Sequence, residues 1–219
     1  FLTFLDTTVV SVALGNIQHS LHAGVTPLQW IVNGYALAFA AMMLPAGAIS
    51  DEFGRKKVML FGAALFCAGS VVCAAAPDYN TLIIGRIIMG LGAAGSEPGT
   101  LSMLRQLFPE EPMRSRVFGV WAAISGLALA LGPVIGGALV GIGGWRLIFW
   151  ANLGLSVVLL TLGWLVLPES SDPRAERLDV VGAVLSVACL GCLVQGVVRA
   201  ENLGYRNSQV VALLATSVV

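Results

Sequence analysis

Charged residues are scarce in this chain of 219 residues. Asp, Glu, Lys and Arg together make up 11% of it, against about 25% in an ordinary soluble domain. Apolar residues make up 57%, and so few charges could not cover a soluble globule with that much apolar area. The 12 basic and 12 acidic residues balance, so no basic surface favours nucleic acid. The composition therefore predicts an integral membrane protein.

Histidine and cysteine are also few. His19 and His22 fall between predicted spans and are interpreted as solvated loop residues, with metal ligation as the alternative. The four cysteines lie inside apolar runs, which argues against a disulfide framework. For the C-x-x-C pair Cys189 and Cys192, packing is favoured over redox chemistry. No span pairs a nucleophile with a base, so the sequence predicts no enzyme, no metal and no cofactor.

Long apolar runs follow one another along the chain, most of them near the roughly 20 residues that cross a bilayer. The runs do not alternate apolar and polar residues as barrel strands do, so we expect an all-α polytopic fold. Seven spans and the start of an eighth are predicted at residues 1–17, 30–49, 58–76, 82–107, 117–142, 147–167, 180–198 and 209–219. The chain lacks an initiator Met and starts and stops within apolar runs, so we expect a fragment.

Positive charges are divided unequally between the two sets of connecting loops. Residues 50–57, 105–116 and 168–179 hold most of the Lys and Arg that lie between spans. The positive-inside rule places these loops in the cytoplasm. The sequence thus predicts a multi-pass protein of the inner (plasma) membrane, in contact with the lipid bilayer.

Three ionisable residues lie inside predicted spans: Asp6, Arg86 and Glu97. A charge near the bilayer centre costs at least ~2.5–3.5 kcal/mol, so such residues indicate function. Asp6 lies near mid-membrane if its span is helical. Arg86 and Glu97 are separated by about three helical turns, or about 16 Å, so we expect them to line one cavity without pairing. The alternative for each residue is a structural ion pair with another helix.

The first predicted cytoplasmic loop combines glycine with charge. Gly54 suits a tight reversal, and Asp51 is placed to stabilise the start of the next helix. A generic positively charged turn is the alternative. The residues of this pattern are Gly47, Asp51, Gly54, Arg55, Lys56 and Lys57.

The fifth span contains a proline among glycines. A proline inside a helix removes a backbone hydrogen bond and kinks the helix, and glycines four residues apart let a neighbour approach closely. A functional kink and simple helix packing are both open. The residues are Gly126, Gly132, Pro133, Gly136 and Gly137.

Residues 90–95 spell G-x-G-x-x-G, the dinucleotide-binding fingerprint. That mechanism needs a preceding strand and a βαβ unit, whereas this stretch lies within the fourth span. We interpret it as small-residue helix packing.

Together these motifs resemble the major facilitator superfamily. Residues 47–57 look like its G-x-x-x-D-x-x-G-R-K/R signature between helices 2 and 3, and residues 86–92 resemble its helix 4 motif. The glycine–proline pattern resembles the helix 5 motif associated with antiporters. Residues 5–14 resemble the helix 1 motif of fourteen-span drug:proton antiporters, and the short link at 168–179 also looks like that branch.

The resemblance implies two six-helix bundles that alternate access to a central cavity, each built from three-helix inverted repeats. This chain would supply an N-terminal six-helix bundle at residues 1–167, a cytoplasmic linker at 168–179 and extra linker helices at 180–219, the second one truncated. The implied function is a proton-coupled antiporter that exports drugs or other small amphipathic compounds, with the proton gradient as energy source. A nutrient symporter or facilitator is the alternative, and no oligomeric state is implied.

The resemblance also implies roles for the motif residues. Asp6, with Glu97 as a second candidate, would gain and lose protons as the cavity opens to either side, and Arg86 would tune this balance. Asp51 and Arg55 would latch the cytoplasmic side, and the kink of the fifth span would govern packing between bundles.

Four positions depart from the family pattern: Ser11 stands where the family usually has Asn, Gly15 where it usually has Pro, and the other two are Gln106 and Glu97. Gln106 stands where family members often carry an acid, so the resemblance does not extend to a charge relay with the helix 2–3 loop. Glu97 occupies a place that is usually apolar, which makes it a candidate proton or cation site of a subfamily.

Overall fold

A computed structural model describes residues 1–169 and 180–217, and every regular element within these ranges is an α-helix. The all-α prediction is therefore confirmed. Residues 170–179, which make up most of the predicted linker, lie outside the described residues. The helices of the described part are α1 (Leu2–Leu21), α2 (Val25–Phe53), α3 (Arg55–Ala74), α4 (Tyr79–Leu107), α5 (Glu111–Gly143), α6 (Arg146–Val166), α7 (Val180–Leu203) and α8 (Ser208–Thr216).

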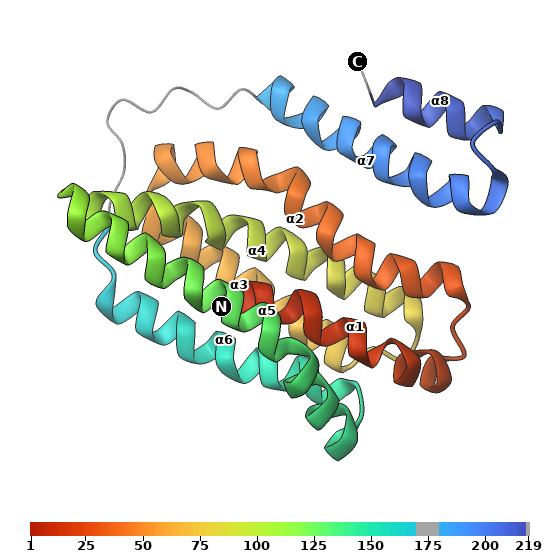
Figure 1. Cartoon of the computed structure of the whole chain (residues 1–219), viewed down its shortest axis with the longest axis horizontal. Helices are drawn as coiled ribbons and strands as arrows, with labels where there is room; N and C mark the ends of the chain where they lie inside the picture. Colours follow the sequence, from red (N-terminus) through yellow and green to blue (C-terminus); the bar gives the residue numbers. More distant parts are fainter. Residues whose placement is uncertain (170–179, 218–219) are drawn as a thin grey trace.

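Helices α1–α6 run lengthwise beside one another, and α7 and α8 form a hairpin that packs along α2 (Figure 1). The main contacts within the bundle join α1 to α5, α2 to α4, α3 to α4 and α3 to α6. Exchanging the first three helices for the next three maps the α1–α5 contact onto α2–α4 and the α3–α6 contact onto itself, as two related three-helix units would. The extensive α3–α4 contact departs from this correspondence, because its counterpart between α1 and α6 is small.

The helices of the bundle differ in how apolar they are. Within the described residues, α2, α3, α5 and α6 are long and apolar enough to cross a bilayer. Their outward side chains include Val134 and Trp164, which suit contact with lipid. Helices α1 and α4 fall short of that composition because they carry the buried residues Asp6, Arg86 and Glu97. The charged residues that lie within the predicted spans of the described part thus face inward.

Glycines allow the close contact between α3 and α4. A Cβ atom on Gly62 would lie 2.6 Å from the carbonyl oxygen of Gly92, and one on Gly69 would lie 2.8 Å from the backbone nitrogen of Met89. Only glycine lets the two backbones approach this far. Gly92 belongs to the G-x-G-x-x-G stretch, so its interpretation as helix packing is confirmed.

The helices extend beyond the predicted spans at the predicted cytoplasmic end. Helix α2 continues to Phe53 and α3 begins at Arg55, so the loop expected at 50–57 is reduced to Gly54. Likewise, only residues 108–110 separate α4 from α5. Hydropathy marks where apolar residues end, whereas the helical hydrogen bonds continue until a glycine or proline interrupts them.

Candidate functional site

A buried ion pair joins α1 to α4 inside the bundle. Arg86 Nη1 donates to Asp6 Oδ2 over 2.5 Å, and the two side chains are 1% and 0% exposed. Asn152 Nδ2 of α6 donates to the other carboxylate oxygen, Oδ1, over 2.7 Å. Both oxygens of Asp6 therefore have a donor, and its charge is compensated without water.

The Arg86 guanidinium makes two further contacts. Its Nε donates to the carbonyl oxygen of Ile31 on α2 over 3.0 Å, and its central carbon lies 4.3 Å from the centre of the Tyr35 ring. Tyr35 in turn donates its hydroxyl to the carbonyl of Thr3 on α1 over 3.2 Å. A carboxylate, a carbonyl and an aromatic face thus stabilise this cation away from water. The ion-pair cluster consists of Asp6, Tyr35, Arg86 and Asn152.

The sequence analysis missed two members of this cluster, Tyr35 and Asn152. It searched the spans for ionisable residues only, and neither residue is charged at neutral pH. One signal could have found Asn152, since it is the one amide in the predicted span 147–167. An amide in hydrocarbon needs a hydrogen-bond partner, so its presence implies one.

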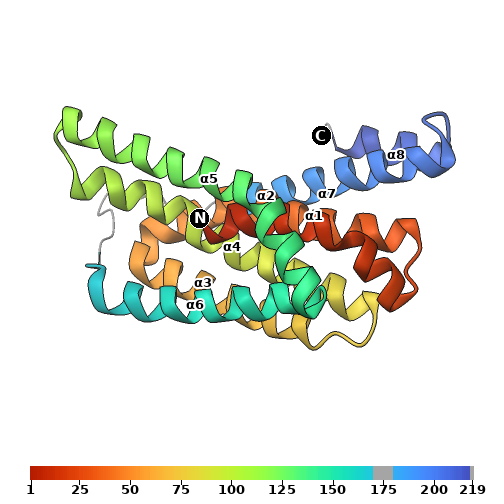
Figure 2. The ribbon, with the colours of Figure 1, turned by 60° about the horizontal axis from the view of Figure 1, so that its bottom comes forward.

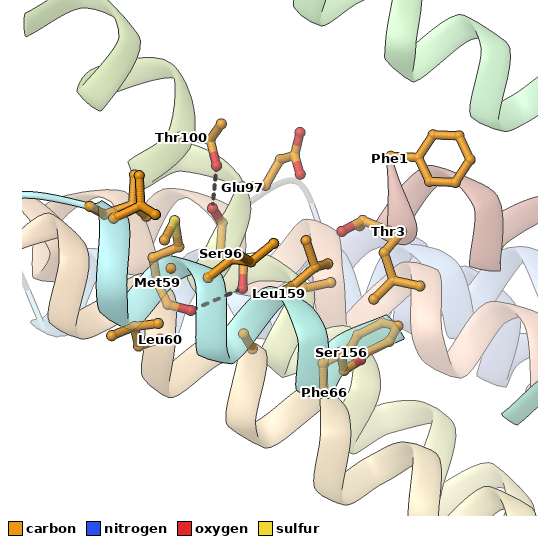
Figure 3. Close-up of a pocket in the computed structure, with 17 residues that line it drawn as sticks. Phe1, Thr3, Met59, Leu60, Phe66, Ser96, Glu97, Thr100, Ser156 and Leu159 are labelled. Atoms are coloured by element: carbon orange, nitrogen blue, oxygen red, sulfur yellow. Dashed lines mark hydrogen bonds between the residues drawn. The ribbon is translucent and has the colours of Figure 1, made fainter. Parts of the chain in front are cut away.

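Glu97 lies apart from the ion-pair cluster and borders a cavity of about 450 Å³ between α1, α3, α4 and α6 (Figure 3). Its side chain is 8% exposed. Within residues 1–169 and 180–217, its carboxylate has neither a hydrogen bond nor an ion pair. Arg86 does not border this cavity, contrary to our expectation, because Asp6 and the Ile31 carbonyl hold it on the side of α1 and α2.

The predicted cytoplasmic motif ties the ends of four helices together. Arg55 Nη2 and Nε donate to Asp51 Oδ1 over 2.7 and 2.9 Å. Arg55 Nη1 donates to Gln106 Oε1 at the end of α4 over 3.1 Å, so a neutral amide stands in for the missing acid. Lys56 Nζ donates to the carbonyl oxygen of Trp164 on α6 over 2.9 Å. These bonds connect α2, α3, α4 and α6.

The two glycines of this motif are required to different degrees. Gly54 has a φ of 108°, a conformation that residues with a Cβ rarely adopt. A Cβ there would also lie 2.7 Å from Glu169 Oε1. A Cβ on Gly47 would lie 3.6 Å from that of Pro98, an ordinary contact. The backbone thus requires glycine at 54, and space alone does not require it at 47.

The glycine–proline motif of α5 packs on α1 directly after the turn that carries Asp6. A Cβ on Gly132 would overlap the side chain of Thr8, and one on Gly136 would lie 2.9 Å from the carbonyl oxygen of Val9. Pro133 removes a backbone hydrogen bond from α5, and the helix changes direction partway along its length (Figure 2). This part of the motif fixes the distance between α5 and α1.

The other two glycines of the motif make no such contact. A Cβ on Gly126 or Gly137 would have no atom within 4 Å. These positions therefore face open space in the described part of the chain. Close packing explains Gly132 and Gly136 but not this pair.

Comparison with known proteins agrees with this arrangement. The family model described as Major Facilitator Superfamily matches residues 1–218. The multidrug resistance protein Stp of Mycobacterium tuberculosis is 36% identical over 219 residues, which is 100% of this chain and 41% of that protein. The methylenomycin A resistance protein of Bacillus subtilis is 35% identical over 215 residues, 98% of this chain and 46% of that protein. The chain spans less than half the length of these relatives.

Solved structures share the fold at lower identity. A bacterial homologue of the human lysosomal transporter Spinster, inward-facing and occupied, has a TM-score of 0.64 at 21% identity over 98% of this chain and 54% of that chain. The POT family transporter PepTSo has a TM-score of 0.64 at 16% identity, covering 100% and 48%. The prediction that the chain belongs to a family of inner-membrane transporters, which are not enzymes, is confirmed. The family match extends along nearly all of the chain and agrees with the polar cluster found inside the apolar bundle. This chain belongs to the major facilitator superfamily.

Proposed function

We propose that the full-length protein is a proton-coupled antiporter that exports drugs or other small amphipathic compounds by alternating access. The relatives carry names that refer to multidrug resistance and to methylenomycin A resistance, which supports export over uptake. The proton gradient would supply the energy, so the transport cycle needs no cofactor.

The observation that carries the proposal is the bond of Asp6 to both Arg86 and Asn152. A carboxylate enclosed in this way holds its helices together only while it is charged. When Asp6 takes up a proton, it loses the charge that attracts Arg86, and the free energy of the ion pair is lost. Protonation at one atom would therefore change the contacts between α1, α4 and α6.

Alternating access requires a second conformation in which water reaches this carboxylate. In the described conformation Asp6 is 0% exposed, so α1 must move for a proton to enter. The contact of Gly132 with Thr8 lies only two residues further along α1. A shift of α1 would therefore displace α5 as well, which makes these helices one moving unit.

The cytoplasmic motif supplies contacts that can break and re-form. The side chains of Arg55 and Asp51 are 12% and 39% exposed, and a partly exposed pair contributes at most about 1 kcal/mol. Such a weak pair opens at little cost in free energy. We assign Asp51 and Arg55 the role of a latch that holds the helix ends in one of the two conformations.

The test is drug efflux driven by an imposed pH gradient in proteoliposomes that hold the full-length protein. Asp6→Asn keeps the shape of the side chain but carries no proton, so we expect it to abolish proton-driven efflux. Substrate exchange without a gradient is expected to continue. Wild-type efflux by this variant would remove Asp6 as the proton carrier.

The matched control is Asp78→Asn at the start of α4. Asp78 accepts a hydrogen bond from the backbone nitrogen of Thr81 as the helix cap, and Asn caps a helix equally well. We expect this variant to transport like the wild type.

A further inference from the structure

The cavity beside Glu97 has mainly apolar walls and, among the described residues, a single charged side chain. Phe66, Leu159 and Leu162 are among the side chains that form its walls. Among the described residues that border it, Glu97 is the only one with an ionisable side chain. Apolar walls with one charged group fit a ligand that has an apolar body and one charge of opposite sign.

Four side chains with hydroxyl groups border the cavity, and those of Ser96, Thr100 and Ser156 donate hydrogen bonds to backbone carbonyls. Ser96 Oγ lies 3.1 Å from the carbonyl oxygen of Gly92 and 3.3 Å from that of Met59. Thr100 Oγ1 donates to the carbonyl of Ser96 over 2.9 Å, and Figure 3 marks this bond and the one from Ser96 to Met59. Ser156 Oγ donates to the carbonyl of Asn152 over 2.7 Å. A hydroxyl has one proton and two lone pairs, so these groups can offer a ligand only acceptors.

The Glu97 carboxylate needs neutralisation. It is 8% exposed and is unpaired within residues 1–169 and 180–217. An ionised carboxylate away from water is unfavourable unless a proton or a cation compensates it. A cationic ligand with N–H groups would satisfy the carboxylate and the hydroxyl lone pairs at once, whereas an anion would be repelled.

We propose that Glu97 selects the charge of the substrate, and that the substrate class is an amphipathic organic monocation with N–H donors, such as a protonated amine with an apolar body. The inference rests on the export function proposed above and deepens it. The cavity of about 450 Å³ lies within the roughly 300–1,000 Å³ of drug-sized pockets. Asp6 does not serve this role in the described conformation, because it is paired with Arg86 and does not border the cavity. Proton and substrate would therefore use different carboxylates.

The test is probe binding by the purified full-length protein, followed by fluorescence polarisation. Ethidium is the cationic probe with amine N–H groups, and Nile red is the neutral probe. Glu97→Gln keeps the shape and removes the charge, so we expect ethidium to bind at least about tenfold more weakly and Nile red to change by less than about twofold. Glu97→Asp keeps the charge and is expected to keep the preference for ethidium.

Glu110→Gln is the matched control, since it makes the same chemical change at the exposed start of α5, where the side chain forms no cap. We expect it to bind both probes like the wild type. Unchanged ethidium binding by Glu97→Gln, equal weakening of both probes, or no ethidium binding by the wild type would each overturn the charge selection. A wild type that binds ethidium through Glu97 but shows no proton-driven efflux would instead refute the proposed function and leave this assignment standing.

Discussion

Asp6 and Glu97 are both carboxylates buried inside the bundle, but their surroundings are opposite. Asp6 is 0% exposed and accepts hydrogen bonds from Arg86 and Asn152. Glu97 is 8% exposed, borders a cavity, and has no partner within residues 1–169 and 180–217. The Asp6 carboxylate joins its own helix, α1, to α4 and α6, whereas the Glu97 carboxylate borders a cavity.

The difference separates a carboxylate that holds helices together from one that we propose binds a ligand. Removing one member of a buried ion pair leaves an uncompensated charge and destabilises the fold strongly. An unpaired carboxylate already carries that unfavourable free energy, so it adds nothing to stability. The cation site proposed above would explain why such a carboxylate is present at Glu97.

The largest effect is expected from Arg86→Met. This change leaves Asp6 buried without a counter-charge, so the free energy of unfolding should fall by about 3–5 kcal/mol, and proton-driven efflux should be lost. Asp6→Asn/Arg86→Met removes both charges and should regain much of the stability. Thermal unfolding of the full-length protein in detergent micelles measures these changes.

The control for this prediction is Arg105→Met at the other end of α4. Arg105 is exposed, and surface substitutions usually change stability by less than about 0.5 kcal/mol. If Arg86→Met were no less stable than Arg105→Met, the ion pair would have no structural role and the contrast with Glu97 would fail.

A smaller loss of stability is expected from Gly132→Ala, which acts on Asp6 through the contact between α5 and α1. In Gly132→Ala the new Cβ overlaps the Thr8 side chain, which pushes α1 away near Asp6 and should lower stability by about 1–3 kcal/mol. Proton-driven efflux should fall, while ethidium binding at Glu97 stays as in the wild type. Gly137→Ala meets no atom within 4 Å and serves as the control, with unchanged stability. Equal behaviour of the two variants would show that the α1–α5 contact is not tight.

The sequence could predict which charged residues lie inside the bundle but not which residues they contact. Apolar runs and charges inside them are properties of single segments, so the helices and the three ionisable residues followed directly. The partner Asn152 lies 146 positions from Asp6, and the acceptor at Ile31 is a backbone carbonyl. Neither contact of the ion pair can be seen as a local pattern in the sequence, because both form only when the helices pack together.

The shared face of Arg86 and Glu97 shows the same limit. Helical periodicity places both on one side of α4, but a long Arg side chain is directed by its strongest partner, here Asp6 on α1. Periodicity therefore predicts which face of the helix a residue lies on, but not where the charged end of a long side chain lies. The replacement of an acid by Gln106 was visible in the sequence, whereas its bond to Arg55 was not.

Glu97→Leu should separate the two carboxylates by the sign of its effect. Removing an unpaired buried carboxylate relieves an unfavourable charge, so the free energy of unfolding should rise by about 1 kcal/mol. Asp6→Leu should lower it, because Arg86 then stays buried without its carboxylate. Thermal unfolding of both variants in the full-length protein gives the comparison. A loss of stability in Glu97→Leu would reveal a structural partner for Glu97.

The smallest effect is expected from Gln106→Glu, which restores an acid opposite Arg55 Nη1, now 3.1 Å from the amide oxygen. Gln106 is exposed and Arg55 is already paired with Asp51, so stability should rise by less than about 1 kcal/mol. Salt should screen this gain, because the pair is open to water. Thermal unfolding at low and high salt measures it, with proton-driven efflux and ethidium binding expected to remain unchanged. A change in either would mean that the latch at the helix ends and the buried carboxylates move together, and Asp6 and Glu97 would then no longer act as independent sites.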